Sequence, residues 1–229
     1  MTARGTRGSR LVVKVGGAVA ADSAGRILGL AEEGHEVIVV HGAGPQITTE
    51  MERLGIPVSF VNGRRRTSHA ALDVVRGSME AVNAELCAAL GDIAVPVLGH
   101  LDGLFAVPVP PLGQVGDPLP SRPKKLMAAL AAGKVPVVAP LAVGPLNVNA
   151  DDAAASLALG IGAKTLVFLT DVAGLYIDDE VVDAIDVSEA RRMLAEGLFE
   201  GGIVPKLRAA ALAAASGITA TIGRTAVVA

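Results

Sequence analysis

The 229-residue chain contains few aromatic residues: no Trp, one Tyr and four Phe. Proteins that bind single-stranded nucleic acid usually stack its bases on aromatic side chains. The net charge of −3 provides no electrostatic attraction for a phosphate backbone either. Both features argue against a nucleic-acid partner.

Cysteine is equally scarce, because Cys87 is the only one in the sequence. A single cysteine excludes an intrachain disulfide and a metal site built from several thiolates, and it fits a reducing compartment. No apolar run near the basic, glycine-containing segment 1–10 is long enough for a signal peptide or a membrane span. We expect a cytoplasmic protein without a membrane partner, with Cys87 packed in the core.

Hydrophobic residues make up 51% of the chain, which is enough to build a large core. Strand-like runs, most of them followed by glycine and a helical pattern, occur at residues 11–15, 36–41, 95–98, 135–139 and 165–169. This alternation predicts an α/β fold in which helices cover a mainly parallel sheet. We expect two closely joined lobes, residues 1–142 and 143–229.

Two further segments have distinct patterns. Between residues 68 and 90, apolar residues recur every three or four positions, which predicts a long helix with one buried face, capped by Thr67 or Ser68. Several prolines and glycines interrupt residues 99–123, so this segment reads as a hairpin that covers a site or joins the lobes.

A polar cluster precedes an alanine-rich helical segment. It contains two amides, Asn147 and Asn149, and two carboxylates, Asp151 and Asp152. Such a cluster can hold polar ligand atoms and orient cations. It can equally be a helix cap in which Asn149 accepts backbone N–H bonds and Asp152 stabilises the positive helix end.

Two lysines occupy positions that structure alone does not favour. Lys14 lies inside an apolar strand, where a lysine needs an anionic partner or an exit at the strand end. Lys206 follows Pro205 at the start of a helix, where a cation is unfavourable by roughly 0.3–1 kcal/mol unless an anion such as phosphate lies nearby. We predict that Lys206 is a phosphate ligand, with a lysine that extends into solvent as the alternative.

Two loops complete the set of candidate binding segments. In residues 41–46, a small-residue turn leads into a helix at Pro45, and its N–H groups can converge on an anion, although an ordinary tight turn uses the same residues. Residues 62–67 contain three arginines, of which at least one is expected to grip a carboxylate. Arg64 and Arg66 are assigned to a solvated edge. The histidines show no metal-ligand spacing, so no metal site is predicted.

Six motifs occur in one order along the chain: Lys-Val-Gly-Gly at 14–17, His-Gly-Ala-Gly at 41–44, Asn-Gly-Arg-Arg-Arg-Thr at 62–67, Asn-Val-Asn-Ala-Asp at 147–151, Leu-Thr-Asp-Val-Ala-Gly-Leu at 169–175 and Gly-Gly-Ile-Val-Pro-Lys at 201–206. This order resembles the amino acid kinase family over nearly the whole chain, and within it the members that phosphorylate N-acetyl-L-glutamate. The resemblance implies an open αβα sandwich, with the acyl-amino acid in the first lobe and ATP in the second. It also implies ATP-dependent phosphorylation of the side-chain carboxylate of N-acetyl-L-glutamate in arginine biosynthesis.

The resemblance also assigns roles to residues. Lys14 and Lys206 would stabilise the transferred phosphoryl group, and Asp151 would hold both lysines in position. The substrate would contact Gly17, Ala43, Gly44, Arg65, Asn147 and Asn149. ATP would contact Gly16, Thr170, Asp171, Val172, Gly174, Leu175, Tyr176, Leu198, Phe199 and Glu200. Mg²⁺ would accompany ATP, bound mainly through phosphates and water.

The chain departs from the family pattern in ways that leave the substrate open. Ala43 stands where the family usually has glycine, so its methyl could narrow the substrate space. Arg64 and Arg66 would suit an acidic carrier protein that presents aminoadipate for lysine biosynthesis, which is one alternative. A non-catalytic nucleotide-binding regulator on the same fold is another. No long helix precedes Lys14, and by resemblance this implies a homodimer.

Overall fold

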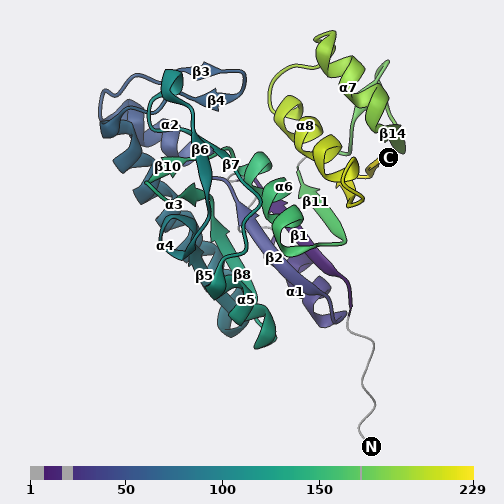
Figure 1. Cartoon of the computed structure of the whole chain (residues 1–229), viewed down its shortest axis with the longest axis horizontal. Coiled ribbons are helices and arrows are strands. Elements are labelled where there is room, and N and C mark those ends of the chain that lie inside the picture. The colour runs from purple at the N-terminus through teal and green to yellow at the C-terminus, as the bar shows by residue number, and fades with distance from the viewer. Residues whose placement is uncertain (1–7, 17–22, 171) are drawn as a thin grey trace, which may run out of the picture.

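The computed structural model describes residues 8–16, 23–170 and 172–229. An eight-stranded sheet runs through the middle of the molecule in the order β14-β16-β15-β11-β1-β2-β8-β5 (Figure 1). Its strands are β1 (Arg10–Val15), β2 (Glu36–His41), β5 (Ala94–Leu98), β8 (Val135–Ala139), β11 (Thr165–Leu169), β14 (Ala184–Asp186), β15 (Thr219–Ile222) and β16 (Thr225–Val228). All neighbours pair in parallel except β15 and β16. The predicted α/β class and mainly parallel sheet are confirmed.

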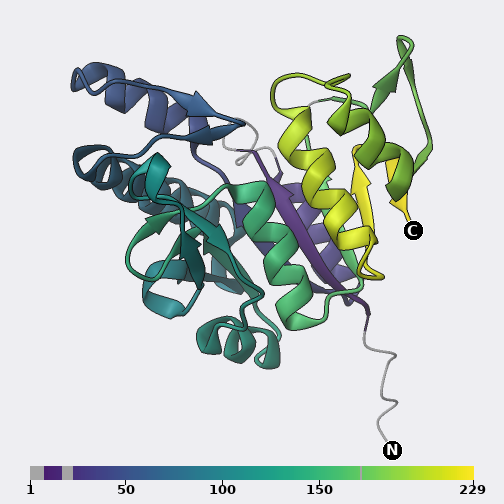
Figure 2. The same cartoon turned by 45° about the horizontal axis from the view of Figure 1, so that its top comes forward.

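Helices cover both faces of this sheet. Successive residues of β1 point to opposite sides, so Val13 packs into one buried core and Val12 into the other. The first core is closed by helices α1 (Ala24–Glu32), α2 (Gly44–Arg53) and α3 (His69–Leu90). The second is closed by α5 (Lys124–Ala131), α6 (Ala150–Ile161), α7 (Val187–Ala195) and α8 (Ile203–Ala214). Figure 2 shows α6 in green and α8 in yellow-green over the sheet.

Local signals in the sequence fix the ends of the longer helices. Ser68 caps α3 by accepting a hydrogen bond from the Ala71 N–H, as the sequence predicted. The Asn149 side chain accepts hydrogen bonds from the N–H groups of Asp151 and Asp152, so the cap that was expected there is present. Helix α6 ends at Gly162, whose φ of 65° is a left-handed conformation that favours glycine.

Short elements connect the main strands and helices. Hairpin β3 (Phe60–Val61) and β4 (Arg64–Arg65) turns at Asn62 and Gly63, whose φ values of 50° and 77° suit a two-residue hairpin loop. The predicted hairpin in residues 99–123 is confirmed as β6 (Ala106–Pro108) paired with β7 (Gly116–Pro118). The remaining short elements are α4 (Gly99–Asp102), β9 (Leu141–Ala142), β10 (Leu146–Asn147), β12 (Tyr176–Ile177), β13 (Glu180–Val181) and the 3₁₀ turns Gly91–Ile93 and Pro110–Leu112.

Strand β1 joins the two halves of the chain, because it pairs with β2 on one side and with β11 on the other. The sheet therefore runs without a break across the boundary between the two expected lobes, residues 1–142 and 143–229. The carboxyl ends of these parallel strands meet at one edge, which is where ligands bind in open α/β sheets. Among the helices that the structure describes, none combines the length and apolar character needed to cross a bilayer.

Candidate active site

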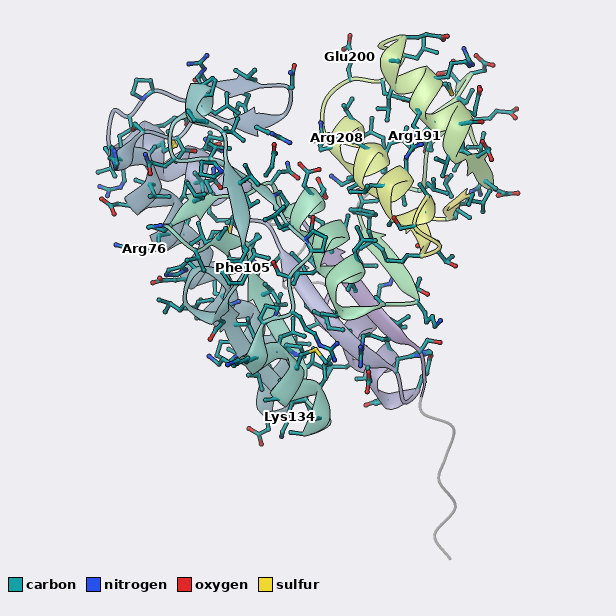
Figure 3. The ribbon with its side chains drawn as sticks, viewed as in Figure 1. Arg76, Phe105, Lys134, Arg191, Glu200 and Arg208 are labelled. Carbon is teal, nitrogen blue, oxygen red and sulfur yellow. The ribbon has the colours of Figure 1, made fainter. Side chains whose placement is uncertain are left out.

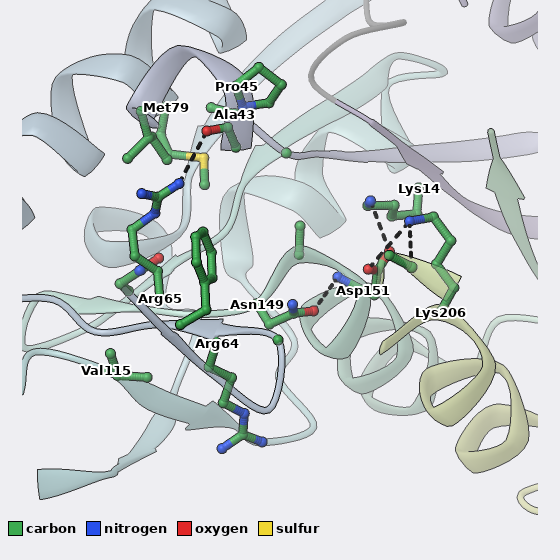
Figure 4. Close-up of a pocket in the computed structure, with 18 residues that line it drawn as sticks. Lys14, Ala43, Pro45, Arg64, Arg65, Met79, Val115, Asn149, Asp151 and Lys206 are labelled. Atoms are coloured by element: carbon green, nitrogen blue, oxygen red, sulfur yellow. Dashed lines mark hydrogen bonds and ion pairs between the residues drawn. The ribbon is translucent and has the colours of Figure 1, made fainter. Parts of the chain in front are cut away.

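A cavity of about 400 Å³ opens at the carboxyl edge of the sheet (Figure 4). Its walls come from the end of β1, the start of α2, the β3–β4 hairpin and the first turns of α6 and α8. The cavity brings together the three predicted catalytic residues and the predicted substrate residues that the structure describes: Lys14, Ala43, Gly44, Arg65, Asn147, Asn149, Asp151 and Lys206. Gly17 lies outside the described residues.

Asp151 lies between the two lysines, and Figure 4 shows both of them pointing toward it. Its Oδ1 is 2.8 Å from the Nζ of Lys14, and its Oδ2 is 3.9 Å from the Nζ of Lys206. Lys14 is buried, so Asp151 supplies the anionic partner that a lysine in a buried strand needs. Two cations share one carboxylate, which leaves a net positive charge beside the cavity. The group therefore favours a bound anion.

The starts of α2 and α8 reinforce this positive field. Among the residues that the structure describes, no side chain caps either helix, and neither helix has an acidic residue in its first turn. The first N–H groups of a helix lack intrahelical partners and attract anions. Gly44 and Gly202, at the starts of α2 and α8, both line the cavity, and the Nζ of Lys206 donates a hydrogen bond to the Gly202 carbonyl at 3.1 Å.

Arg65 enters the cavity from the hairpin as a buried guanidinium. Its NH2 group donates to the Thr48 Oγ1 at 2.7 Å and to the Gly44 carbonyl at 3.2 Å, and its NH1 lies 3.4 Å from the Met51 sulfur. The Phe60 ring lies 4.7 Å from the guanidinium carbon. All these partners are neutral, and burial lowers the pKa of Arg65. A buried cation with neutral partners is suited to a ligand carboxylate.

Asn147 holds the hairpin against the rest of the site. Its Nδ2 donates to the Thr67 Oγ1 at 2.9 Å, and this hydroxyl donates to the Arg65 carbonyl at 2.9 Å. Both Asn147 and Thr67 are buried. This chain of hydrogen bonds fixes the backbone from which the Arg65 side chain extends.

His41 was assigned no role from the sequence, but it helps to tie β2, α3 and β8 together. It is fully buried at the end of β2, and its Nε2 accepts a hydrogen bond from the Asn83 Nδ2 at 3.1 Å. The same Nδ2 donates to the Val137 carbonyl on β8 at 2.9 Å. Burial lowers the pKa of His41 to about 4, so the imidazole is neutral. A histidine that ends an apolar strand was the sequence signal for this role.

The family model described as the amino acid kinase family matches residues 9–224. The chain belongs to this family. It is 45% identical to the acetylglutamate kinase of Rubrobacter xylanophilus over 221 residues, which cover 93% of this chain and 87% of that protein. It is 35% identical to the acetylglutamate kinase of Geobacillus kaustophilus, covering 89% of this chain and 84% of that one. The crystal structure of smu.665 from Streptococcus mutans matches with a TM-score of 0.87 and 25% identity, covering 96% and 98% of the two chains.

Ala43 departs from the amino acid kinase pattern at the turn before α2. Its φ of −141° and ψ of 29° lie outside the left-handed region, so this position does not need glycine for a positive φ. Its side chain has no solvent exposure and packs in the core with Ile47. Ala43 also belongs to the cavity wall, so the expectation that its methyl narrows the substrate space stays a prediction.

The residues predicted to bind ATP lie apart from the substrate residues. Gly16 follows β1 and Thr170 follows β11, while Asp171 lies outside the described residues. The apolar side chains of Val172, Tyr176 and Leu198 are exposed, as is Glu200 (labelled in Figure 3), and Phe199 is half-buried. None of the described members of this predicted set lines the 400 Å³ cavity.

Gly174 and Leu175 have packing roles. A Cβ on Gly174 would lie 2.5 Å from the Thr225 Oγ1, so only glycine fits there. The Leu175 side chain is fully buried, and its N–H donates to the same Thr225 oxygen at 2.8 Å. Leu175 therefore offers no side-chain surface to a nucleotide, because its side chain belongs to the core.

Met79 and Val115 are among the side chains that line the cavity and were missed by the site prediction. Met79 belongs to the buried face of α3 that the spacing of apolar residues predicted, and the middle of that helix reaches the cavity. Val115 had no sequence signal, because it lies in the loop between β6 and β7. Phe60 was also missed, although an aromatic residue just before an Asn-Gly turn was a usable signal.

Two expectations outside the catalytic set need correction. The prediction that Arg64 lies on a solvated edge is wrong, because its NH1 pairs with Asp117 and its NH2 lies 3.7 Å from the Asp152 Oδ2. These acids are distant in sequence, so no local pattern revealed them. Cys87 is half-buried, more open than a core thiol, and burial raises its pKa. Arg66 is exposed, as expected.

Metal-binding side chains do not gather anywhere in residues 8–16, 23–170 or 172–229. No three of the described His, Cys, Asp and Glu side chains lie close enough together to hold an ion.

Proposed function

We propose that this chain transfers the γ-phosphoryl group of ATP to the side-chain carboxylate of N-acetyl-L-glutamate, in the arginine pathway. One observation carries the proposal: a single cavity holds the Lys14–Asp151–Lys206 group and, beside it, the buried guanidinium of Arg65. Such a cavity suits a substrate with a carboxylate for Arg65 and a second carboxylate for the lysine group. The relatives named acetylglutamate kinase support the same substrate.

The residues fit a reaction that needs little covalent work from the protein. A substrate carboxylate is already an adequate nucleophile, so no general base is required. Arg65 would bind the other carboxylate, and Asn147, Asn149 and the Ala43–Gly44 backbone would orient the molecule. Lys14 and Lys206 would stabilise the charge that develops on the phosphoryl oxygens, while Asp151 keeps both amines in place.

The place of ATP is proposed from the family resemblance and from the positions of the predicted ATP-binding residues. ATP would lie on the lobe of residues 143–229, with its phosphates near the start of α8 and its adenosine near Val172, Tyr176 and Leu198. Thr170, Phe199 and Glu200 would border this place, and Gly16 would face the phosphates. Mg²⁺ would arrive with ATP and bind mainly to phosphate oxygens and water.

A homodimer in the cytoplasm is also part of the proposal. Strand β5 is the sheet edge on the side of the substrate lobe, and a free edge invites pairing. Leu101, just after this edge, is 72% exposed, and the Phe105 side chain is exposed beyond it. Exposed apolar side chains of this size beside a sheet edge fit an interface with a second copy. The free Cys87 fits a reducing compartment.

The carrier-protein alternative is less well supported. It relied on Arg64 and Arg66 as free cations for an acidic carrier, but Arg64 is already paired with Asp117 and Asp152. A non-catalytic regulator would not need two lysines directed at one phosphate position.

ADP release with Mg-ATP tests the proposal, with N-acetyl-L-glutamate and N-acetyl-aminoadipate compared side by side. We expect turnover with the first compound that disappears in Lys206→Ala. No turnover with either compound, in protein that still binds ATP, would contradict the proposal and redirect the search to a carrier-bound substrate.

A further inference from the structure

Asp151 and Asp152 are successive acids in the first turn of α6, but they contact different partners. Asp151 points into the cavity, whereas Asp152 accepts two hydrogen bonds from the NH2 of Arg208, at 3.3 Å and 3.1 Å. The Asp152 Oδ2 is also 3.7 Å from the NH2 of Arg64. One mostly buried carboxylate therefore lies between two guanidinium groups.

These three side chains come from three separate elements. Arg64 belongs to the β3–β4 hairpin, Asp152 to the first turn of α6 and Arg208 to α8, the helix on which Figure 3 labels it. The hairpin approaches α8 at a second point as well. A Cβ added to Gly63, at the hairpin tip, would lie 3.9 Å from ring carbons of Pro205. The hairpin thus reaches from the substrate lobe to the helix that carries Lys206.

Each member of this bridge is close in sequence to a residue of the site. Arg64 precedes Arg65, Asp152 follows Asp151, and Arg208 lies two positions after Lys206. The bridge and the site therefore share the same three pieces of backbone. A shift in any of these pieces changes both the bridge and the distances around the cavity.

The electrostatics favour a fixed arrangement. Burial raises the pKa of Asp152, and the charges of Arg208 and Arg64 oppose this rise. The desolvated Asp152 carboxylate accepts charge-assisted hydrogen bonds from Arg208 and forms a longer ion pair, at 3.7 Å, with Arg64. Arg64 has a second carboxylate in Asp117, so loss of the Asp152 charge would release α8 more than the hairpin.

We propose that Asp152 is a positioning residue that fastens the β3–β4 hairpin to helix α8, so that binding of the acyl-amino acid and binding of ATP favour each other. The inference rests on the proposed function. It assigns to Asp152 no contact with either substrate. A substrate that orders the hairpin would, through Asp152, also order the helix that carries Lys206.

The test measures how much one ligand changes the affinity for the other. Calorimetry gives the Kd of a non-hydrolysable Mg-ATP analogue with and without saturating N-acetyl-L-glutamate, and the ratio of the two values is the coupling factor. Asp152→Asn removes the charge, and Asp152→Glu retains it. Asp183→Asn is the control, because Asp183 is highly exposed and forms a surface pair with Arg224.

We expect a coupling factor of about fivefold or more in the wild type and in Asp183→Asn, since allosteric couplings commonly start near that size. The factor should fall to near one in Asp152→Asn, with each ligand alone bound about as well as before, and should partly return in Asp152→Glu. A role in stability alone would lower the melting temperature and leave the factor unchanged.

If Asp152→Asn does not fold, Arg208→Met tests the same bridge. Arg192→Met is the control, because among the described contacts Arg192 pairs only with Glu189 in α7 and with Glu196 just after it. A wild-type factor near one, or an unchanged factor in the folded variant, would overturn the inference while turnover preserves the proposed function. Absence of turnover and of N-acetyl-L-glutamate binding in the wild type would overturn both.

Discussion

The proposed substrate side and the proposed nucleotide side of this molecule are built differently. On the substrate side, Arg65 is 7% exposed and donates hydrogen bonds to the Gly44 carbonyl and the Thr48 hydroxyl. On the nucleotide side, the predicted ATP residue Tyr176 is 51% exposed. Buried polar groups reject a ligand that leaves them unpaired, whereas exposed apolar side chains contribute mainly contact area. The acyl-amino acid should therefore be selected strictly and the nucleotide base more loosely.

Lys14 lies where the proposed substrate and nucleotide sides meet. Its substitution should cause the largest loss of activity. Lys14→Met removes one of the two charges beside the phosphoryl position and leaves Asp151 with Lys206 at 3.9 Å. We expect kcat to fall about 10²–10³-fold, the usual cost of losing one group that stabilises transition-state charge. Steady-state kinetics measure this, with the exposed Lys164→Met as the control. A loss below tenfold would mean that Lys14 mainly serves the fold.

His41, which lies on the proposed substrate side, should make the stability of the folded protein sensitive to acid. Its pKa is about 4 in the folded protein and about 6.5 when exposed, so between these values the unfolded chain binds a proton that the folded chain does not. The free energy of unfolding should therefore fall as pH drops from 6.5 to 4, by about 3 kcal/mol in total. Urea unfolding across this range measures the slope. His41→Gln should flatten it, and an equal slope in the variant would contradict the assignment.

Arg65 should separate the two sides most clearly. Arg65→Gln removes a charge-assisted hydrogen bond worth about 1.5–3 kcal/mol, so the KM for N-acetyl-L-glutamate should rise roughly 10–100-fold. The KM for ATP should change little. The exposed neighbour Arg66→Gln is the matched control and should leave both constants near the wild-type values. Equal increases in the KM for N-acetyl-L-glutamate and the KM for ATP in Arg65→Gln would contradict the proposed separation of the substrate side from the nucleotide side.

Tyr176 should give the smallest effect, on the nucleotide side alone. Tyr176→Ala removes an exposed ring worth about 1 kcal/mol in base stacking, so the KM for ATP should rise roughly fivefold. The KM for N-acetyl-L-glutamate should stay the same. Leu54→Ala, an exposed apolar residue at the end of α2, is the control. An unchanged KM for ATP would place the adenosine elsewhere.

The parts of this molecule that the sequence could predict are those specified locally. The apolar strands β1, β2, β5, β8 and β11 and the Asn149 cap each follow from a few adjacent residues. Strands β14, β15 and β16 were missed, because runs of only three or four residues carry too little periodicity.

Contacts between distant residues were beyond the same reasoning. The need of Lys14 for an anion was evident from its strand, but its partner Asp151 came from the family resemblance rather than from a pattern. Neither a local pattern nor the resemblance predicted the contacts of Arg64 with Asp117 and of His41 with Asn83. More than 40 residues separate the partners of each pair. Only the assembled fold brings them together, because Arg64, Asp117 and Asn83 lie in the elements β4, β7 and α3 outside the central sheet.

The proposed function requires that this chain form an acyl phosphate on N-acetyl-L-glutamate. The most direct test is to run the reaction with Mg-ATP in the presence of hydroxylamine, which converts an acyl phosphate to a stable hydroxamate, and to identify the product by mass spectrometry. We expect the side-chain hydroxamate of N-acetyl-L-glutamate, formed in step with ADP and absent in Lys206→Ala. ADP release without that hydroxamate would contradict the proposed function.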